Sequence, residues 1–506
     1  MTAGRGTWSR PRRYDRNLVV IGAGSAGLVS AYLGAALRAG VTLVEGDRMG
    51  GDCLNTGCVP SKAIIRSARL AAESRRAASF GLSGTPLTVD FAAVMDRVQS
   101  KIAAVAPHDS VERFSALGVD VRRGRARIVS PWCVEVDGSP ITTRAIVIAA
   151  GAEPIVPDLP GLADTEYLTS ESLWRLRRLP SRLLVLGGGP IGCEMAQAFA
   201  QLGSQVTLVQ QAPRLLMRED DEVSALVAER MAADGVRVLT GTKAVAIETT
   251  DGVRTLRITQ DGAASTTPFD AILIAIGRRA RTSGYGLEEL GIGITPTQTV
   301  ATNAFLQTSQ PSIVACGDVA GPYQFTHAAA HQAQSAVLTG LFAPFYRSRP
   351  DYTVMPAVTF TDPEVARVGL NEREAKAQGI AYECVRYNLN ELDRAIVDGA
   401  TEGFLKVLTQ PAKDRILGAT IVGAHAGESL TEFALAMRHG IGLKGLLNTA
   451  HAYPTYAEAN RYVAGAWRRA HASPTALGLL ARFHAWRRGA AALSKSNRTE
   501  QGAPSA

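Results

Sequence analysis

The first organised stretch of the chain has a hydrophobic pattern that predicts a strand, a tight turn, a helix and a second strand. Residues 18–21 (LVVI) form a short, continuous apolar run, which is typical of a strand buried on both faces. The glycine-rich segment 22–27 (GAGSAG) follows at once and leads into an alanine- and leucine-rich stretch typical of a helix. A second apolar run, 41–44 (VTLV), ends at Glu45. This order of elements is typical of the start of a dinucleotide-binding unit.

Three glycines and one acid in this stretch are candidate cofactor-binding residues. Gly22, Gly24 and Gly27 have the G-x-G-x-x-G spacing, which lets the backbone approach a pyrophosphate at the positive N-terminus of the helix. Glu45 lies twenty-three residues past Gly22 and can accept hydrogen bonds from ribose hydroxyls. The alternative is a glycine turn that only packs the helix on the sheet. The flanking strands and the acid favour the dinucleotide site.

The same unit recurs 165 residues later in the chain. An apolar run at 183–186 (LLVL) precedes a second glycine motif, and another run at 206–209 (VTLV) follows it. The glycines of this motif are Gly187, Gly189 and Gly192. Two such units in one chain predict two dinucleotides, of which one is held permanently and the other is exchanged.

The second unit has Gln210 where the first has Glu45. An acid at this position would select NAD, because it bonds the ribose 2′-hydroxyl and repels a 2′-phosphate. Gln210 removes that repulsion, and Arg214 and Arg218 follow close by. The two arginines either contact such a phosphate or only solvate a surface turn. NADPH and NADH therefore both stay candidate cofactors.

Two cysteines five positions apart lie between the two units, in the segment GGDCLNTGCVPSK over 50–62. Cys53, Cys58 and Lys62 fall at a probable helix start, and both a helix N-terminus and a nearby lysine lower the pKa of a thiol. A zinc site would need further Cys or His at C-x2-C spacings, and none follow. The segment therefore predicts a redox-active disulfide and no metal site. The other cysteines are isolated and are expected to be small buried or loop residues: Cys133, Cys193, Cys316 and Cys384.

Composition and charge narrow the class of protein further. The 506 residues are 46% hydrophobic and 20% charged with 49 glycines, which excludes a disordered, collagen-like or disulfide-scaffold protein. No stretch approaches the roughly 20 apolar residues of a membrane span. The N-terminus lacks the apolar core of a secretory signal, and six cysteines suggest a reducing, cytoplasmic compartment. The net charge of +8 is concentrated in 1–16 and 461–506, so the central part is not expected to bind nucleic acid.

These motifs resemble the pyridine nucleotide–disulfide oxidoreductases, the flavoprotein family of dihydrolipoyl dehydrogenase, glutathione reductase and mercuric reductase. The resemblance runs from about residue 17 to 470. Besides GGDCLNTGCVPSK it rests on five further motifs, IVIAAG (146–151), AIGR (275–278), ACGDVA (315–320), MPAVTFTDPE (355–364) and HAYPTYAE (451–458).

The resemblance implies an α/β fold with two Rossmann-like dinucleotide-binding domains and a C-terminal α+β dimerisation domain, so that the chain forms a homodimer. The FAD-binding domain is split around the NAD(P)-binding domain. The expected borders are a basic N-terminal extension (1–16), the FAD domain (17–160 and 285–350), the NAD(P) domain (161–284), the interface domain (351–470) and a basic amphipathic tail (471–506).

The resemblance also implies roles for single residues. Cys58 would be the thiol that faces the flavin, and Cys53 would exchange with the substrate. Lys62 and Glu194 would lie near the isoalloxazine, and Asp318 would contact the ribityl or phosphate region. The strand-turn motifs add two cofactor-binding positions, Gly151 and Gly277.

Two departures limit the prediction of the substrate. Where the disulfide-reducing members have a His as acid–base before Pro-Thr, this chain has Tyr453, with Glu458 five residues on. His451 is more readily a loop histidine than a displaced base. Mercuric reductases resemble this chain in having Tyr there, but they carry a C-terminal vicinal Cys pair, whereas the last cysteine here is Cys384. Their N-terminal metal-binding domain has no counterpart in this sequence either.

The sequence thus predicts an FAD-dependent NAD(P)H oxidoreductase of mercuric-reductase-like type. It would pass electrons through the flavin and the Cys53–Cys58 pair to a thiophilic metal ion or a small oxidised acceptor. A dihydrolipoyl dehydrogenase is the alternative within the family, and Tyr453 argues against it. An alternative of another class is a redox sensor in which the Cys pair switches conformation without turnover.

The tail is predicted to contain a short helix over 476–488. Its apolar residues fall near one side, and its charge comes from three arginines. The two sets are Leu479, Leu480, Phe483 and Trp486, and Arg482, Arg487 and Arg488. The helix either packs on its own dimer or makes a weak peripheral contact with anionic membrane lipid or an acidic partner.

Overall fold

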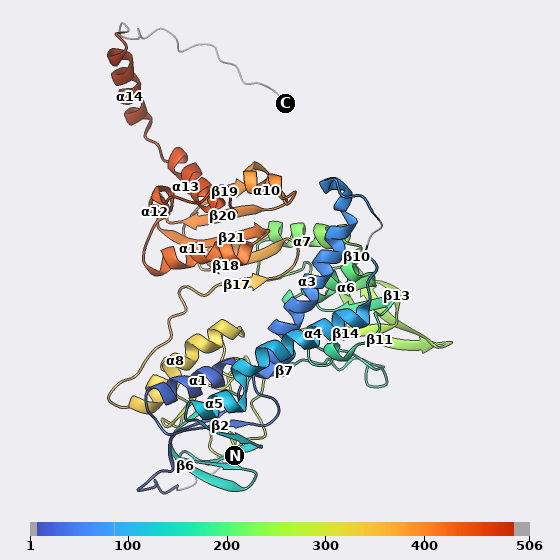
Figure 1. The fold of residues 1–506 in the computed structure, drawn as a ribbon, viewed down its shortest axis with the longest axis vertical. Coiled ribbons are helices and arrows are strands. Elements are labelled where there is room, and N and C mark those ends of the chain that lie inside the picture. The colour runs from blue at the N-terminus through green and yellow to red at the C-terminus, as the bar shows by residue number, and fades with distance from the viewer. Residues whose placement is uncertain (1–7, 85–86, 490–506) are drawn as a thin grey trace. The chain divides into compact units, whose positions relative to one another are not determined.

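A computed structural model describes residues 8–84 and 87–489 of the protein (Figure 1). Of the predicted basic extension and tail, residues 1–7 and 490–506 lie outside the described residues. The chain divides into two compact units, one ending at Ala366 and the other beginning at Arg367. None of the described helices is both long and apolar enough to cross a bilayer.

The first sheet of the N-terminal unit contains the strand–turn–helix–strand pattern at the start of the chain. Its strand order is β3-β2-β1-β6-β5-β4, and β16 also pairs with β6. Pairing is parallel among β3, β2, β1, β6 and β16, and antiparallel among β6, β5 and β4. The strands are β1 (Arg16–Ile21), β2 (Val41–Glu45), β3 (Asp120–Arg123), β4 (Ala126–Ser130), β5 (Cys133–Val136), β6 (Ser139–Ile148) and β16 (Ile313–Ala315).

The strands read as unbroken apolar runs because both faces of this sheet are covered, by helices on one face and by residues of β4, β5 and the segment 285–300 on the other. Leu18, Val19 and Val20 in β1 are all fully buried, because side chains on both faces of the sheet are covered. The helices α1 and α8 pack against each other and against this sheet. Their bounds are α1 (Ser25–Ala36) and α8 (Thr326–Phe342).

The second glycine motif lies in a separate parallel sheet with the order β10-β9-β8-β14. Its strands are β8 (Arg182–Leu186), β9 (Gln205–Val209), β10 (Val236–Leu239) and β14 (Ala271–Ile274), with helices α6 (Pro190–Leu202) and α7 (Asp221–Ala233). An antiparallel sheet, β11-β12-β13, is inserted before β14. These strands are β11 (Thr242–Thr250), β12 (Val253–Gln260) and β13 (Ala263–Phe269).

A two-stranded ladder marks where the chain leaves the first sheet and returns to it. β7 (Ala152–Pro154) follows β6, and β15 (Arg278–Ala280) follows β14; the two pair antiparallel. β16, beyond β15, then joins the first sheet again. The first sheet is therefore assembled from both sides of the inserted second sheet, as the split arrangement predicts. The numerical domain borders stay predictions.

The described part of this unit has four further α-helices, which lie between β2 and β3 along the chain, and one further strand near its C-terminal end. α3 packs against both α4 and α6. The elements are α2 (Gly51–Asn55), α3 (Cys58–Arg75), α4 (Phe91–Val105), α5 (Val111–Ala116) and β17 (Ala357–Thr359).

The C-terminal unit is built on antiparallel strands covered by helices. Within it the strand order is β18-β21-β20-β19, and every residue of β20 is buried. The strands are β18 (Glu364–Gly369), within which the two units divide, β19 (Glu383–Asn388), β20 (Phe404–Thr409) and β21 (Ile416–Gly423). The helices are α9 (Glu372–Ala377), α10 (Asp393–Val397), α11 (Ala426–Arg438), α12 (Leu443–Asn448), α13 (Glu458–Ala470) and α14 (Pro474–Arg487).

Candidate active site

The first glycine turn joins β1 to α1 with a close approach of backbone to backbone. Gly22 has φ +99°, and a Cβ there would overlap the carbonyl oxygen of Ala149. A Cβ on Gly27 would overlap the carbonyl of Gly22, so neither Gly22 nor Gly27 has room for a side chain. Gly24 differs, because its Cβ would meet nothing nearer than the Cα of Gly51 at 3.9 Å. The middle glycine thus leaves the helix N-terminus accessible, as a bound pyrophosphate requires.

Glu45 closes this turn from the end of β2. One carboxylate oxygen accepts a hydrogen bond from the backbone N–H of Ala23 at 2.6 Å, and the other accepts from Asp47 N–H at 2.8 Å. A carboxylate has about four acceptor sites. Glu45 therefore keeps capacity to accept from ribose hydroxyls.

The second glycine turn, between β8 and α6, has the same pattern of close contacts as the first. Gly187 has φ +112°, Cβ atoms on Gly187 and Gly192 would overlap backbone carbonyls, and one on Gly189 would meet nothing within 4 Å. The side-chain oxygen of Gln210 accepts from Gly188 N–H at 2.9 Å, as Glu45 does from Ala23. Gln210 preserves the bond to the turn and lacks the charge of the acid.

Arg214, which follows Gln210, is held by its own loop. Its guanidinium donates to Glu219 O at 2.6 Å and to Ser224 Oγ at 3.2 Å, and it pairs with Asp221 at 3.2 Å. Only 18% of its side chain is exposed. Arg214 therefore stabilises the loop, which neither alternative for the two arginines anticipated.

The cysteine segment starts directly against the first glycine turn. Gly50 N–H donates to Ala23 O at 2.9 Å, and a Cβ on Gly51 would lie 2.6 Å from the Cα of Gly24. Cys53 lies in α2 and is partly buried, while Cys58 is the first residue of α3 and is exposed. The segment thus carries both thiols from the first turn to a helix N-terminus.

The two thiols differ strongly in acidity. A hydrogen bond from Cys53, the hydroxyl of Thr326 and the charge of Lys62 lower the pKa of Cys58 to about 6, against desolvation and the carboxylate of Glu194. The Thr326 oxygen lies 3.3 Å from the Cys58 sulfur. The same hydrogen bond to Cys58, together with burial, raises the pKa of Cys53. Of the two thiols, Cys58 is therefore the more acidic and Cys53 the less acidic.

Lys62 and Glu194 come together from α3 and α6. The ammonium lies 2.7 Å from one carboxylate oxygen, and the other oxygen accepts from Phe360 N–H at 2.9 Å. The ammonium also lies 4.4 Å from the centre of the Phe360 ring. Glu194 is almost fully buried, and these two partners satisfy both of its carboxylate oxygens. This pair fixes a cation one helical turn from Cys58.

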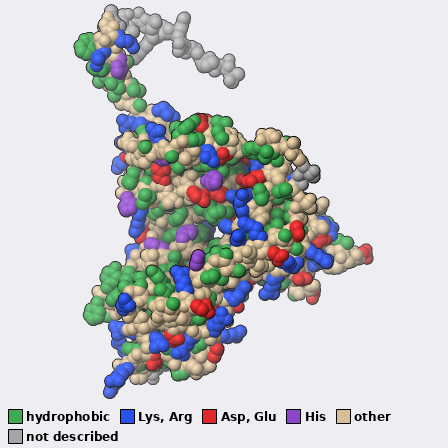
Figure 2. Space-filling model, viewed as in Figure 1, with side chains coloured by type: hydrophobic (Ala, Val, Ile, Leu, Met, Phe, Trp, Pro, Cys, Tyr) green, Lys and Arg blue, Asp and Glu red, His purple; other side chains and the backbone are tan. Residues whose placement is uncertain are grey.

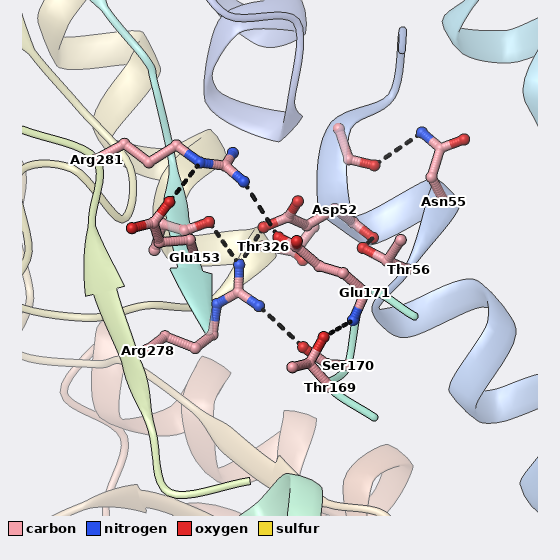
Figure 3. A network of polar contacts seen from close by, with 12 residues as sticks. Asp52, Asn55, Thr56, Glu153, Thr169, Ser170, Glu171, Arg278, Arg281 and Thr326 are labelled. Carbon is pink, nitrogen blue, oxygen red and sulfur yellow. Dashed lines mark hydrogen bonds and ion pairs between the residues drawn. The ribbon is translucent and has the colours of Figure 1, made fainter. Parts of the chain in front are cut away.

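Asp318 lies three residues after the end of β16 and is partly buried. Burial raises the pKa of Asp318 to about 6, and the charges of Asp52 and Cys58 act in the same direction against Arg278. Arg278 forms an ion pair with Asp52 (Figure 3). Asp318 is thus close enough to Asp52, Arg278 and Cys58 for their charges to act on it, and its contact with the flavin stays a prediction.

Three residues of this site had no role in the sequence-based prediction. Thr326 is 268 residues from Cys58, and no local pattern marks it. Arg278 lies within the AIGR motif and Asp52 within the cysteine motif, so the spacing pointed to their neighbourhood but not to their ion pair.

Gly151 and Gly277 directly precede β7 and β15, and their carbonyls accept from Arg281 N–H and Ile155 N–H, each at 3.0 Å.

Tyr453 and Glu458 lie in one loop of the C-terminal unit without touching each other in a hydrogen bond. The Tyr453 hydroxyl is exposed and donates to Asp393 at 3.0 Å, which raises the pKa of Tyr453. Glu458, at the start of α13, is buried and accepts from Thr455 N–H at 3.2 Å and from Tyr462 at 3.4 Å. Tyr453 is therefore a hydroxyl donor, and Glu458 fixes the loop.

His451 is anchored in the same unit by groups that accept hydrogen bonds. Its Nε2 lies 3.0 Å from Glu432, and its Nδ1 lies 3.0 Å from Thr449 O. Only 6% of its side chain is exposed. This is the environment of a loop histidine. Of the isolated cysteines, Cys193 and Cys316 are buried, whereas Cys133 and Cys384 lie in strands rather than loops.

Comparison with known proteins covers nearly the whole of this architecture. The family model of the pyridine nucleotide-disulphide oxidoreductases matches residues 16–333 of the sequence. The family model of their dimerisation domain matches residues 355–464. A dihydrolipoyl dehydrogenase of Chlamydia muridarum is 31% identical over 87% of this chain and 94% of its own length. A mercuric reductase of Lysinibacillus sphaericus is 32% identical over 88% of this chain and 81% of its own length.

A solved structure also resembles this chain over most of its length. The HOCl-induced flavoprotein disulfide reductase RclA from Escherichia coli superposes with a TM-score of 0.79 and 27% identity, covering 89% of this chain and 99% of RclA. The family uses FAD and NAD(P)H, and the two glycine turns of this chain provide two matching sites. The chain is a flavin-dependent oxidoreductase with a dimerisation domain, and it belongs to the pyridine nucleotide-disulphide oxidoreductase family.

Proposed function

We propose that this chain passes electron pairs from NAD(P)H to the Cys53–Cys58 disulfide, and from the dithiol to a thiophilic metal ion or a small oxidised acceptor. The observation that carries the proposal is the asymmetry of the two thiols. Cys58 is held as a thiolate by a thiol, a hydroxyl and an ammonium, and Cys53 keeps its proton. A pair that only stabilised the fold would not need this arrangement.

Bound FAD would accept a hydride from the nicotinamide and deliver two electrons to a disulfide, which cannot accept a hydride directly. Reduction of the cysteine pair breaks its sulfur–sulfur bond, places a proton on Cys53 and leaves Cys58 as the thiolate. Lys62, held by Glu194, balances the negative charge of that thiolate. Transfer of both electrons to the acceptor re-forms the disulfide and releases the Cys53 proton. A divalent ion would take the pair to become the metal, or two ions would take one electron each.

Two observations favour a metal ion or another small acceptor over lipoamide. Tyr453 stands where a thiol–disulfide exchange needs a base, and its bond to Asp393 raises the pKa of Tyr453, so even less of the phenolate that could act as a base is present near neutral pH. The related flavoprotein RclA has been solved as a complex with Cu(II). The dihydrolipoyl dehydrogenase alternative stays open, because relatives of both names are about equally similar to this chain.

Steady-state oxidation of NADPH and NADH with a panel of acceptors tests this proposal. We expect turnover with Hg(II) or Cu(II) to exceed turnover with lipoamide or oxidised glutathione. A Cys53→Ala, Cys58→Ala double variant gives the background from direct flavin oxidation, because it retains the flavin site and lacks the pair. Efficient lipoamide turnover would instead identify a dihydrolipoyl dehydrogenase. The absence of turnover above that background with any acceptor would support the sensor alternative.

We also propose that the protein is a homodimer in which the partner subunit supplies the Tyr453 loop to the cysteine pair. The dimerisation domain, matched at residues 355–464, supports the dimer. The cysteine usage supports a reducing, cytoplasmic compartment.

For the tail we propose a weak contact with anionic lipid. The helix α14 has five large apolar side chains that are exposed, and Trp486 is 73% exposed. Arginines lie beside them, and Figure 2 shows hydrophobic and basic side chains next to each other on this helix. The apolar set is Leu477, Leu479, Leu480, Phe483 and Trp486. Such a helix can enter the headgroup layer while its arginines bind lipid phosphates.

A further inference from the structure

Two acidic residues, Asp52 and Asp318, each follow a glycine that packs against the N-terminal end of α1 and the first glycine turn. The glycine before Asp52 packs on the turn, since a Cβ there would lie 2.6 Å from the Cα of Gly24. The glycine before Asp318 packs on the first turn of α1, since its Cβ would lie 3.0 Å from the Cβ of Ala26. Both acids therefore leave the backbone close to the same helix end.

The guanidinium of Arg278, a residue of β15, interacts with these acids and with the paired strand β7. It pairs with Asp52, donates to Ala152 O at 2.8 Å and reaches Ser170 Oγ at 3.4 Å (Figure 3). Its side chain is only 16% exposed. Its charge also acts on Asp318, opposing the charge of Asp52 there.

Charges of both signs therefore lie close to this helix end. A helix N-terminus favours negative charge, and a pyrophosphate brings at least one such charge per phosphate. Asp52 adds a further negative charge at the turn, where an uncharged residue would add none. In a partly buried site such a charge is not fully screened by water.

We propose that Asp52 weakens the binding of the flavin at the first glycine turn and that Arg278, by pairing with Asp52, limits this effect, so that the pair sets the rate of flavin release. The inference rests on the FAD of the family and on residues of this chain, and it does not depend on which acceptor is reduced. Asp52 is in this sense a positioning residue, since it acts on the flavin through charge and through the orientation of Arg278.

The test is the rate at which FAD leaves the protein, followed by the rise in fluorescence of free FAD after dilution. Asp52→Asn should slow release by about tenfold, and Arg278→Gln should accelerate it by at least about tenfold, the effect that one neighbouring charge commonly has on a partly buried group. The double variant, which loses both charges, should fall between the single variants. These differences should shrink at high salt.

Arg279→Gln is the matched control, because Arg279 lies next to Arg278 on β15 and pairs with Glu153 at 2.7 Å but is 66% exposed. It should leave the rate of release unchanged. A purely structural role of the Asp52–Arg278 pair predicts that both single variants accelerate release, and this result would overturn the proposal. If Arg278→Gln does not fold, Asp52→Asn decides alone, because unchanged or faster release in that variant contradicts the proposal.

Discussion

At the scale of single residues, the acidity of Cys58 depends on three neighbouring groups. The Cys53 thiol donates to Cys58, and this bond is the largest contribution to the low pKa of Cys58. Thr326 and Lys62 reinforce it from α8 and α3. The nucleophilic form of a cysteine is its thiolate, so the reactivity of the pair follows the titration of Cys58.

We expect the reduced protein to be alkylated at Cys58 with a rate that rises through about pH 6 and is constant above it, because the lowered pKa makes the thiolate the dominant form there. Cys53→Ala removes the donated hydrogen bond and should move this midpoint to higher pH. Iodoacetamide labelling followed by peptide mass spectrometry measures both. A midpoint in the reduced native protein at the ordinary pKa of a cysteine would contradict the account.

The neutral side chain of Gln210 should decide between the two nicotinamides. We expect NADPH to be used at least as well as NADH, because no acid repels a 2′-phosphate. Gln210→Glu keeps an oxygen for the bond to Gly188 N–H and adds a charge, so it should shift kcat/KM towards NADH. Gln211→Glu is the control, since it adds the same charge at an exposed neighbour. A strong native preference for NADH would show that Gln210 does not favour NADPH.

The same scale shows what a pattern in the sequence can and cannot predict about a site. Cys53, Cys58 and Lys62 were identifiable because they lie within one segment of thirteen residues. Glu194 was placed near them only through the family resemblance, and Thr326 not at all, because their contacts join segments 132 and 268 residues apart. A pairing over such distances depends on tertiary packing and leaves no periodic signal in the local sequence.

At the scale of elements, the two glycine units were predictable because buried parallel strands read as continuous apolar runs. β7 and β15 were not, since each has three residues and its partner lies more than 120 residues away. The tail helix begins at Pro474, two residues before the predicted start. Ser473 caps it by accepting from Ala476 N–H at 3.3 Å, and Pro474 suits the first helical position.

The exposed apolar side chains of α14 give the element-scale prediction. We expect the full chain to sediment with anionic vesicles at low salt and to be released at high salt, because a short helix with few arginines binds weakly and reversibly. A chain ending at Ala472 should stay in the supernatant, and vesicles of neutral lipid are the control. Equal behaviour of the two chains would leave packing on the dimer as the role of α14.

At the scale of the whole molecule, the Tyr453 loop is expected to act on the partner's cysteine pair. Tyr453→Phe should leave reduction of the flavin by NADPH intact and slow only the reaction with the acceptor, because the hydroxyl acts on the thiol side. Stopped-flow measurement of the two half-reactions separates these effects. Tyr382→Phe, which also removes a hydroxyl bonded to a carboxylate in the C-terminal unit, is the control.

Mixed dimers show which subunit supplies the hydroxyl. One subunit carries Tyr453→Phe, and the other carries Cys53→Ala with Cys58→Ala. If the loop acts on the partner, such a dimer has one site with both native parts and keeps about half of the native acceptor rate per dimer. If the loop acts within its own subunit, no site is complete, and the mixed dimer keeps only about half of the slow Tyr453→Phe rate per dimer. Slow flavin reduction in Tyr453→Phe itself would contradict the role on the thiol side.

The central claim is that Cys53 and Cys58 form the redox pair next to the flavin, and the absorbance spectrum of the reduced protein tests it most directly. Anaerobic reduction by two electrons should produce a thiolate–flavin charge-transfer band at the red edge of the flavin spectrum. Cys58→Ser should abolish the band, because the thiolate at the start of α3 is lost. Cys53→Ser should show it without any reduction, because Cys58 can no longer form the disulfide. A Cys53→Ser protein that binds FAD and lacks the band would contradict the account.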